Sequence, residues 1–350
     1  MCMYLNGDLG TSTFHGLIRS SVKSASAYVA YYSGFLRIYQ FLSGQGGSEV
    51  IILMYHRILE RPERKRLGAD ALGTTPQAFE MQVAYLCNRY RVLSLDAFVE
   101  AIQSGAKLPR RCSVITFDDG YKDNYTLAYP ILRRYSAPAT MFLATGHVGT
   151  NNLFWTDKLD YVLKNTSASK LETPELGSYD LGSTANRLRA ISEMKMRLKA
   201  MPDEEKDYLV DSLVNYFGVR IPPELGADLF LSWDDVRTMH RNGVSFGAHT
   251  VTHPRLTKVS KERARSEIAE SKKKIEQELN ERVRSFAYPG GAFDNNIKSM
   301  VREEGFACAV TIRRGINNLG SDLYELRRVG IEEQPFHEFA FDVSGISLRC

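Results

Sequence analysis

The chain contains 350 residues, of which 43% are hydrophobic, and its formal net charge at pH 7 is +4. A chain of this size can bury a large core and commonly forms one catalytic domain with additions. The small net charge gives no electrostatic footprint for nucleic acid, so we expect no nucleic-acid partner. Five cysteines without paired spacing favour a reducing compartment over a disulfide-rich secreted fold.

Strands and helices alternate along the sequence from residue 50 onward, which is typical of a parallel sheet with crossover helices. Thr75 and Pro76 provide the cap and first position expected at the start of a helix. The expected strands cover residues 50–55, 112–117, 139–145, 243–248, 283–288, 306–312 and 324–329, and the expected helices cover residues 76–88, 94–105, 125–135, 232–242, 260–280 and 295–304.

Residues 151–230 interrupt this alternation. Residues 186–199 and 203–217 predict two helices on either side of Pro202, and the acidic residues after Pro202 favour the start of the second helix. We therefore expect a helical insertion in the alternating unit.

Two adjacent carboxylates, Asp118 and Asp119, close the apolar strand at residues 112–117. Neighbouring side chains on a strand point to opposite faces, so the pair can meet only if the strand ends there, and Gly120 allows a sharp turn. Two carboxylates at the tip of a buried strand repel one another unless a cation or a proton compensates. This position therefore indicates a metal site.

Two histidines follow a second predicted strand end, about 130 residues downstream. His249 and His253 are four residues apart, so their imidazoles can lie on one turn. One aspartate with two histidines gives the mixed oxygen and nitrogen ligands of a catalytic zinc-type site with open positions. In isolation the pentapeptide also fits two unrelated surface histidines; the strand-end aspartates favour the metal site.

Three segments together resemble the motifs of the polysaccharide deacetylases, the NodB-homology enzymes of carbohydrate esterase family 4. They are Thr116–Gly120, His249–His253 and Phe286–Gly291, and the resemblance extends over roughly residues 50 to 335. The resemblance implies an α/β fold, a distorted (β/α)7 barrel, here with the helical insertion at about residues 151–230 beside its mouth. Strand-end ligands suit a barrel, whose active site lies at the carboxyl ends of its strands.

The same resemblance implies roles for individual residues. Asp118 becomes the general base, and Asp119, His249 and His253 hold one divalent metal ion, zinc or alternatively nickel or cobalt. The turn that begins at Tyr288 brings the Gly290 N–H toward the developing oxyanion. Trp155 could stack on a sugar ring, with core packing as the alternative.

The chain departs from the common family pattern at two positions. Many members carry an arginine in the third motif that pairs with the catalytic aspartate, and this chain has Ala287 there. Arg327 or Arg328 on the late strand could replace it, with an exposed strand arginine as the alternative. Many members also carry a histidine on the last motif strand as the general acid, and this chain has none.

His56 is the candidate to replace that acid. It ends the first strand and resembles the Tyr-His motif of the poly-N-acetylglucosamine deacetylase branch, in which this histidine is assigned as the acid. A purely structural histidine is the alternative. His147 is a weaker candidate for the rim of the site, and we read His337 as structural or at the surface.

Residues 1–49 precede the barrel as an amphipathic segment. From residue 11 to residue 48 there is no acidic residue, while Arg19, Lys23 and Arg37 alternate with aromatic and aliphatic residues. No apolar run approaches the roughly 20 residues needed to span a bilayer. We expect residues 11–48 to contact the membrane interface, with packing against the barrel as the alternative.

The sequence thus predicts a metal-dependent N-deacetylase that removes acetyl groups from an N-acetylhexosamine glycan or its precursor. A glycan-binding pseudo-enzyme and an amidohydrolase of a small non-sugar amide are the alternatives. The expected location is cytoplasmic, peripheral at the inner membrane face, with an extracytoplasmic location as the alternative.

Overall fold

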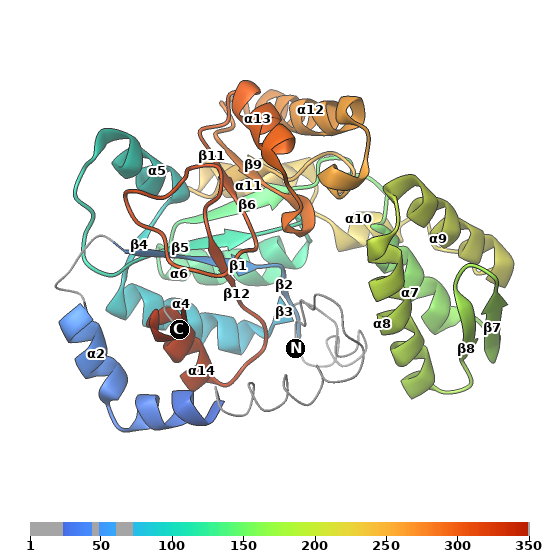
Figure 1. The fold of residues 1–350 in the computed structure, drawn as a ribbon, viewed down its shortest axis with the longest axis horizontal. Coiled ribbons are helices and arrows are strands. Elements are labelled where there is room, and N and C mark those ends of the chain that lie inside the picture. The colour runs from blue at the N-terminus through green and yellow to red at the C-terminus, as the bar shows by residue number, and fades with distance from the viewer. Residues whose placement is uncertain (1–23, 44–48, 61–72, 349–350) are drawn as a thin grey trace.

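The computed structural model describes residues 24–43, 49–60 and 73–348. At its centre, seven parallel strands follow the order β11-β10-β9-β6-β5-β1-β12 (Figure 1). These strands are β1 (Val50–Tyr55), β5 (Cys112–Phe117), β6 (Ala139–Leu143), β9 (Ser245–Ala248), β10 (Ser285–Ala287), β11 (Cys308–Val310) and β12 (Arg328–Gly330).

The two ends of this strand order almost meet. Val310 on β11 forms a parallel bridge to Leu326, and the Ala309 N–H donates to the carbonyl of Leu323 at 2.8 Å. The last strand is shorter than the expected 324–329, because residues 323–326 bond to β11 before the chain joins β1 at β12. The result is a nearly closed barrel, which confirms the predicted distorted (β/α)7 fold.

Helices surround the barrel and begin at the residues that the sequence indicates. The Thr75 hydroxyl caps the helix that begins at Pro76. The Ser94 and Ser260 hydroxyls cap two further helices. The barrel helices are α4 (Pro76–Arg89), α5 (Leu95–Ser104), a π-helix (Asn124–Ala128) continued by α6 (Tyr129–Arg134), α11 (Trp233–Arg241), α12 (Lys261–Leu279), α13 (Asn295–Glu303) and α14 (Phe336–Val343). Short strands β2 (Arg57–Ile58) and β3 (Gly73–Thr74) pair together, and β4 (Arg91–Leu93) pairs with β5.

Alternate strand residues face two different cores, as the period of a strand requires. The inward-facing set fills the barrel and includes Val50, Ile52, Cys112, Val114, Phe142, Ala287 and Val310. The barrel interior is crowded: a Cβ at Gly247 would lie 2.6 Å from the Phe142 ring. The outward-facing set packs under the helices and includes Leu53, Ile115, Phe117, Met141 and Phe286.

The insertion is a lobe with its own core, more elaborate than the two helices expected (Figure 1). It comprises α7 (Trp155–Asn165), the hairpin β7 (Lys170–Thr173) and β8 (Gly177–Asp180), α8 (Thr184–Ala200), α9 (Asp203–Phe217) and α10 (Leu225–Leu229). The sequence did not predict the hairpin, because each strand has four residues and buries only one side chain. This side chain is Leu171 in β7 and Tyr179 in β8.

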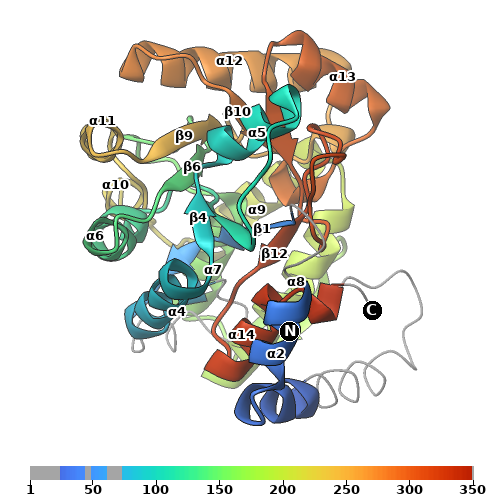
Figure 2. The same cartoon turned by 90° about the vertical axis from the view of Figure 1, so that its left-hand side faces the viewer.

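The described part of the N-terminal segment is helical at residues 24–32 and in α2 (Phe35–Ser43), and it lies beside α14 (Figure 2). Ala27, Ala30 and Leu36 pack against Ala340 and Phe341. Residues 1–23 and 44–48 of the predicted segment lie outside the described residues. Within the described ranges, none of the helices has the length and apolar content to cross a bilayer.

Candidate active site

The two aspartates leave β5 in different directions because the strand ends between them. Asp118 continues the inward row of Cys112, Val114 and Thr116. Asp119 has φ of 78° and Gly120 has φ of 81°, so the backbone turns into the left-handed region. This conformation is uncommon for a residue with a side chain. It allows neighbouring carboxylates to face one site, as the adjacent pair predicted.

Asp118 is held by an arginine from β12. Arg328 Nη1 donates to Asp118 Oδ1 at 2.7 Å, and Nη2 donates to Oδ2 at 2.6 Å. Its Nε donates to the Thr311 carbonyl at 2.9 Å, and Nη1 also reaches Thr116 Oγ1 at 3.1 Å. Arg328 is fully buried, whereas Arg327 is exposed. Of the two proposed replacements for the arginine absent at Ala287, the structure therefore selects Arg328.

The Arg328 guanidinium determines the charge of Asp118. Burial alone would raise the pKa of this carboxyl, but the two-pronged ion pair outweighs burial and lowers it. Asp118 is therefore ionised at neutral pH, as a proton acceptor must be.

Asp119, His249 and His253 form a cluster whose ligand atoms all lie within 4.8 Å of one another. Asp119 Oδ1 is 3.5 Å from His249 Nε2 and 3.4 Å from His253 Nε2. The remaining ring nitrogen of His249, Nδ1, lies 2.7 Å from the Ala287 carbonyl and donates to it, which leaves Nε2 free to ligate. One carboxylate and two oriented imidazoles fit a divalent ion.

The protonation of the two imidazoles also suits a metal site. Burial lowers the pKa of His253 to about 3, so this ring is neutral at pH 7. At His249 burial acts in the same direction, but the carboxylates of Asp119 and Asp118 outweigh it and raise the pKa. A proton and a metal ion therefore compete for His249 Nε2.

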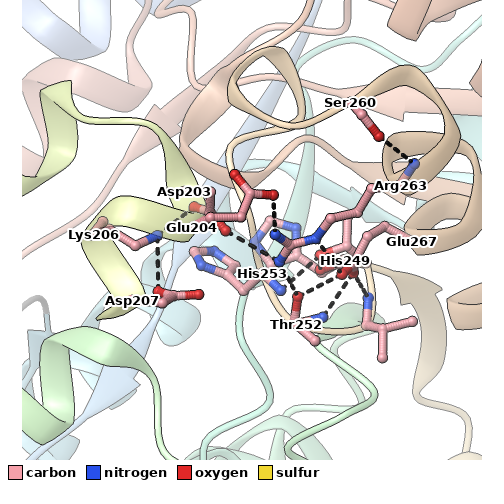
Figure 3. A network of polar contacts seen from close by, with 12 residues as sticks. Asp203, Glu204, Lys206, Asp207, His249, Thr252, His253, Ser260, Arg263 and Glu267 are labelled. Atoms are coloured by element: carbon pink, nitrogen blue, oxygen red, sulfur yellow. Dashed lines mark hydrogen bonds and ion pairs between the residues drawn. The ribbon is translucent and has the colours of Figure 1, made fainter. Parts of the chain in front are cut away.

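The turn between the histidines is strained. Thr250 has φ of 68° and His253 has φ of 61°, and Thr250 is β-branched. Such conformations cost on the order of 1–3 kcal/mol each and persist only where surrounding contacts hold them. Thr250 Oγ1 accepts the His253 N–H at 3.0 Å and donates to the His249 carbonyl at 2.5 Å. The strained backbone places both imidazoles on one side (Figure 3).

His56 lies beside this cluster. It follows β1, is partly exposed, and is close enough to contribute to the lowered pKa values of Asp118 and Asp119. His147 and His337 lie in different surroundings. His147 is buried with its ring 4.1 Å from Phe154, and His337 on α14 lies 5.4 Å from the Tyr28 ring of the N-terminal helix.

The structure places the remaining predicted site residues in different surroundings. Gly290 lies in the turn after β10 with φ of 57°, next to the side chain of Arg255. Tyr288 is fully buried, its hydroxyl donates to the Tyr324 carbonyl at 3.1 Å, and its N–H donates to Val310. Trp155 packs against the insertion core. For these two residues the structure places the side chain in packing.

Sequence reasoning missed several residues near the site. The Phe154 ring lies 4.9 Å from the His253 ring, and the Arg57 guanidinium lies 4.7 Å above the Tyr121 ring. The Tyr121 hydroxyl reaches Asp157 Oδ2 at 3.4 Å, and burial raises the pKa of Asp157 to about 7. Each is adjacent in sequence to a predicted site residue or within two residues of one, and this proximity is the signal that could have found them.

The fold and the site define a parallel α/β barrel with a side-chain group suited to hold a metal ion. Residues 105–309, more than half of the chain, match the family model for polysaccharide deacetylase. The chain belongs to this family. It is therefore a hydrolase of carbon–nitrogen bonds other than peptide bonds, of the deacetylase class.

Individual relatives agree with this assignment. The poly-beta-1,6-N-acetyl-D-glucosamine N-deacetylase of Staphylococcus epidermidis is 28% identical over 216 residues, 57% of this chain and 72% of that protein. The Streptococcus pyogenes deacetylase PplD superposes with a TM-score of 0.59 at 22% identity, covering 85% of this chain and 99% of that one. IcaB from Ammonifex degensii gives 0.56 at 18% identity, covering 85% and 98%. At these identities the two structures show the shared fold.

Replacing one imidazole tests the metal site. We expect His253→Ala to lose stoichiometric divalent-metal binding, because it removes one of three ligands, while the apo-protein melts as the unsubstituted chain does. Metal content after dialysis and calorimetric titration measure this. His240→Ala, which alters a partly buried histidine whose Nε2 lies 2.8 Å from Glu281 Oε2, is the matched control. Full occupancy in His253→Ala would reject the ligand assignment.

The buried ion pair predicts a specific loss of stability. Arg328→Ala leaves Asp118 charged and unpaired, so unfolding should be easier by about 3–5 kcal/mol at pH 7. The exposed neighbour provides the control, since Arg327→Ala should change stability by no more than about 0.5 kcal/mol. Without Arg328, burial raises the folded-state pKa of Asp118, so the loss should be largest where the variant's Asp118 is ionised and should shrink as the pH falls and this carboxyl takes up a proton. Urea unfolding across this range measures it, and equal effects of the two substitutions would contradict the pairing.

Proposed function

We propose that this chain is a metal-dependent N-deacetylase of an N-acetylhexosamine glycan or its precursor. The observation that carries the proposal is that two adjacent carboxylates have different partners. Asp118 is fixed and ionised by Arg328, and Asp119 faces the two imidazoles. The name of the Staphylococcus epidermidis relative supports a poly-N-acetylglucosamine substrate.

Asp119, His249 and His253 would hold the ion, which we propose to be zinc, with nickel or cobalt as alternatives. When bound, a divalent ion supplies Lewis acidity that polarises an amide carbonyl and makes a nucleophile available from water near neutral pH. The mixed carboxylate and imidazole donors suit these ions.

Asp118 is the proposed general base. Its two oxygens are engaged by the Arg328 fork, which fixes the carboxylate plane and keeps it ionised. A proton taken from the attacking water would reside on Asp118, and the Arg328 charge keeps this carboxyl a strong enough acid to release it again.

His56 is the proposed general acid. The amine leaving an amide needs a proton, and a partly exposed imidazole beside both aspartates can supply it. Gly290, in the turn after β10, is the proposed oxyanion donor through its N–H, since its turn admits close approach of a substrate to the backbone.

Two other functions remain as outcomes of the test. A glycan-binding pseudo-enzyme was suggested by the missing motif arginine, and Arg328 on Asp118 removes much of that reason. A small-amide hydrolase would use the same site. Acetate release from acetylated glycans, from small amides and from metal-free protein distinguishes the three functions.

The chemistry of the leaving group tests His56. We expect His56→Ala to reduce turnover of an N-acetyl amide by ~100-fold or more with unchanged metal content, because the amine departs only when protonated. An activated aryl acetate, whose leaving group needs no proton, should lose much less. Asp118→Asn provides the comparison, because it removes the base and should slow both substrates. Equal losses of amide and ester turnover in His56→Ala would remove His56 from the mechanism.

We also propose that the N-terminal segment contacts an anionic membrane surface from the cytoplasmic side. Its described part packs one face on α14 and leaves the other face apolar and exposed. This exposed face, which we call the N-terminal apolar patch, comprises Tyr28, Val29, Tyr32, Phe35 and Ile38, each at least half exposed. Arg37 is exposed beside it, and the absence of acidic residues from 11 to 48 favours negative lipids.

Vesicle binding tests this contact. A chain with Tyr32→Ser and Ile38→Ser should co-sediment less with anionic vesicles than the unsubstituted chain, and added salt should weaken binding of the latter. Tyr208→Ser, at an exposed tyrosine of the insertion, is the matched control. Sedimentation that is indifferent to both the patch and salt would leave packing against α14 as the segment's only role.

A further inference from the structure

One carboxylate of α12 holds the turn that carries both imidazoles. Glu267 Oε2 accepts the N–H groups of Val251 and Thr252, each at 2.8 Å, and Oε1 accepts the Thr252 hydroxyl at 2.5 Å. The Glu267 side chain is only 7% exposed, so these bonds are made away from water. Three donors from two adjacent residues thus converge on one buried carboxylate. The two donor residues lie between His249 and His253 in the sequence.

Arg263 lies one helical turn before Glu267 and connects the turn to the insertion (Figure 3). On the barrel side, its Nε is 3.8 Å from Glu267 Oε1 and its Nη2 is 3.4 Å from Thr252 Oγ1. On the insertion side, Nη1 donates to Glu204 Oε1 at 2.7 Å and Nη2 reaches Asp203 Oδ2 at 3.3 Å. A single guanidinium therefore contacts both the ligand turn and the start of α9.

The turn needs such restraint because its backbone is strained. Thr250 and His253 both occupy the left-handed region, which residues with side chains leave when nothing holds them. α9, in turn, belongs to a lobe that packs around its own core, with Asp203 buried at its start. The contacts of Arg263 with Glu204 and Asp203 hold its guanidinium in place. They therefore also limit the position of this guanidinium relative to Thr252 and Glu267.

We propose that Glu267 and Arg263 are positioning residues for the metal-ligand turn. Glu267 holds residues 251–252, and Arg263 ties this held turn to the insertion, so the insertion contributes to metal affinity although it supplies no ligand. The inference rests on the proposed metal site. It assigns a role to residues that touch neither the metal ligand atoms nor the reacting groups.

The first experiment measures metal affinity with the carboxylate neutralised. Zinc is titrated against a competing chelator in the full chain, and the cobalt-substituted protein reports ligand geometry by its visible absorption. Glu267→Gln keeps the shape of the side chain and should weaken zinc binding by ~10–100-fold and alter the cobalt spectrum. The control is Glu276→Gln on the same helix, where Glu276 accepts the Val283 N–H at 3.0 Å far from the ligand turn in sequence.

The second experiment tests the connection to the insertion. Arg263→Ala should weaken zinc binding, and Arg263→Lys should restore part of the loss. Arg265→Ala, which breaks a 2.9 Å ion pair to Glu303 on the same helix, should leave affinity unchanged. Asp203→Asn, within the insertion, should also weaken binding. When Asp203→Asn and Arg263→Ala are combined, their effects on zinc affinity should be less than additive, because both changes remove the contact between Asp203 and Arg263.

The outcomes separate this inference from the proposed function. If the unsubstituted chain binds no divalent metal, the proposed site itself is wrong. If it binds metal and Glu267→Gln binds as tightly as Glu276→Gln, the holding role is rejected while the deacetylase proposal stands. If only Glu267→Gln weakens binding, and Arg263→Ala matches Arg265→Ala, the link to the insertion is rejected. Melting of each apo-protein shows whether a loss reflects the turn or general unfolding.

Discussion

An arginine and an aspartate meet inside a nearly closed barrel, where both side chains are almost wholly buried, and this pair constrains the site around them. An isolated charge in such a place is strongly unfavourable, so each partner depends on the other. Arg328 uses Nε for the Thr311 carbonyl and both Nη atoms for Asp118, which leaves little freedom in its position. The ends of β5 and β12 are therefore held in register by charge as well as by the β1 strand between them.

The strain of the site follows from the same requirement for convergence. Strand geometry sends consecutive side chains to opposite faces, yet the site needs Asp118 and Asp119 together. Likewise, it needs His249 and His253 to face one point from a short turn. The chain meets both demands with left-handed backbone at Asp119, Thr250 and His253. Contacts with neighbouring residues must hold these conformations. Glu267 provides three such contacts, the hydrogen bonds that it accepts from Val251 and Thr252.

The insertion and the N-terminal helices are the parts that distinguish this chain from a bare barrel. The insertion has an independent core yet reaches the ligand turn through charged contacts at one helix start. The N-terminal helices use one apolar face to cover α14 and leave another exposed. One addition therefore contacts the ligand turn, and the other presents the N-terminal apolar patch to the surface of the protein.

The sequence by itself determined the local elements and the chemistry of the site. Periodicity, caps and strand-end motifs were sufficient to predict the alternating strands and helices, because these signals lie within short segments. The resemblance of three motifs to the polysaccharide deacetylases added the barrel and the ligand set of Asp119, His249 and His253. Only the tertiary structure decided which arginine faces Asp118, since Arg327 and Arg328 are adjacent and the inward direction depends on how β12 pairs with β1. It also placed the Tyr288 side chain in the core and linked Arg263 to the insertion. Such contacts join residues far apart in the chain, and burial, register and packing between elements determine them rather than local pattern.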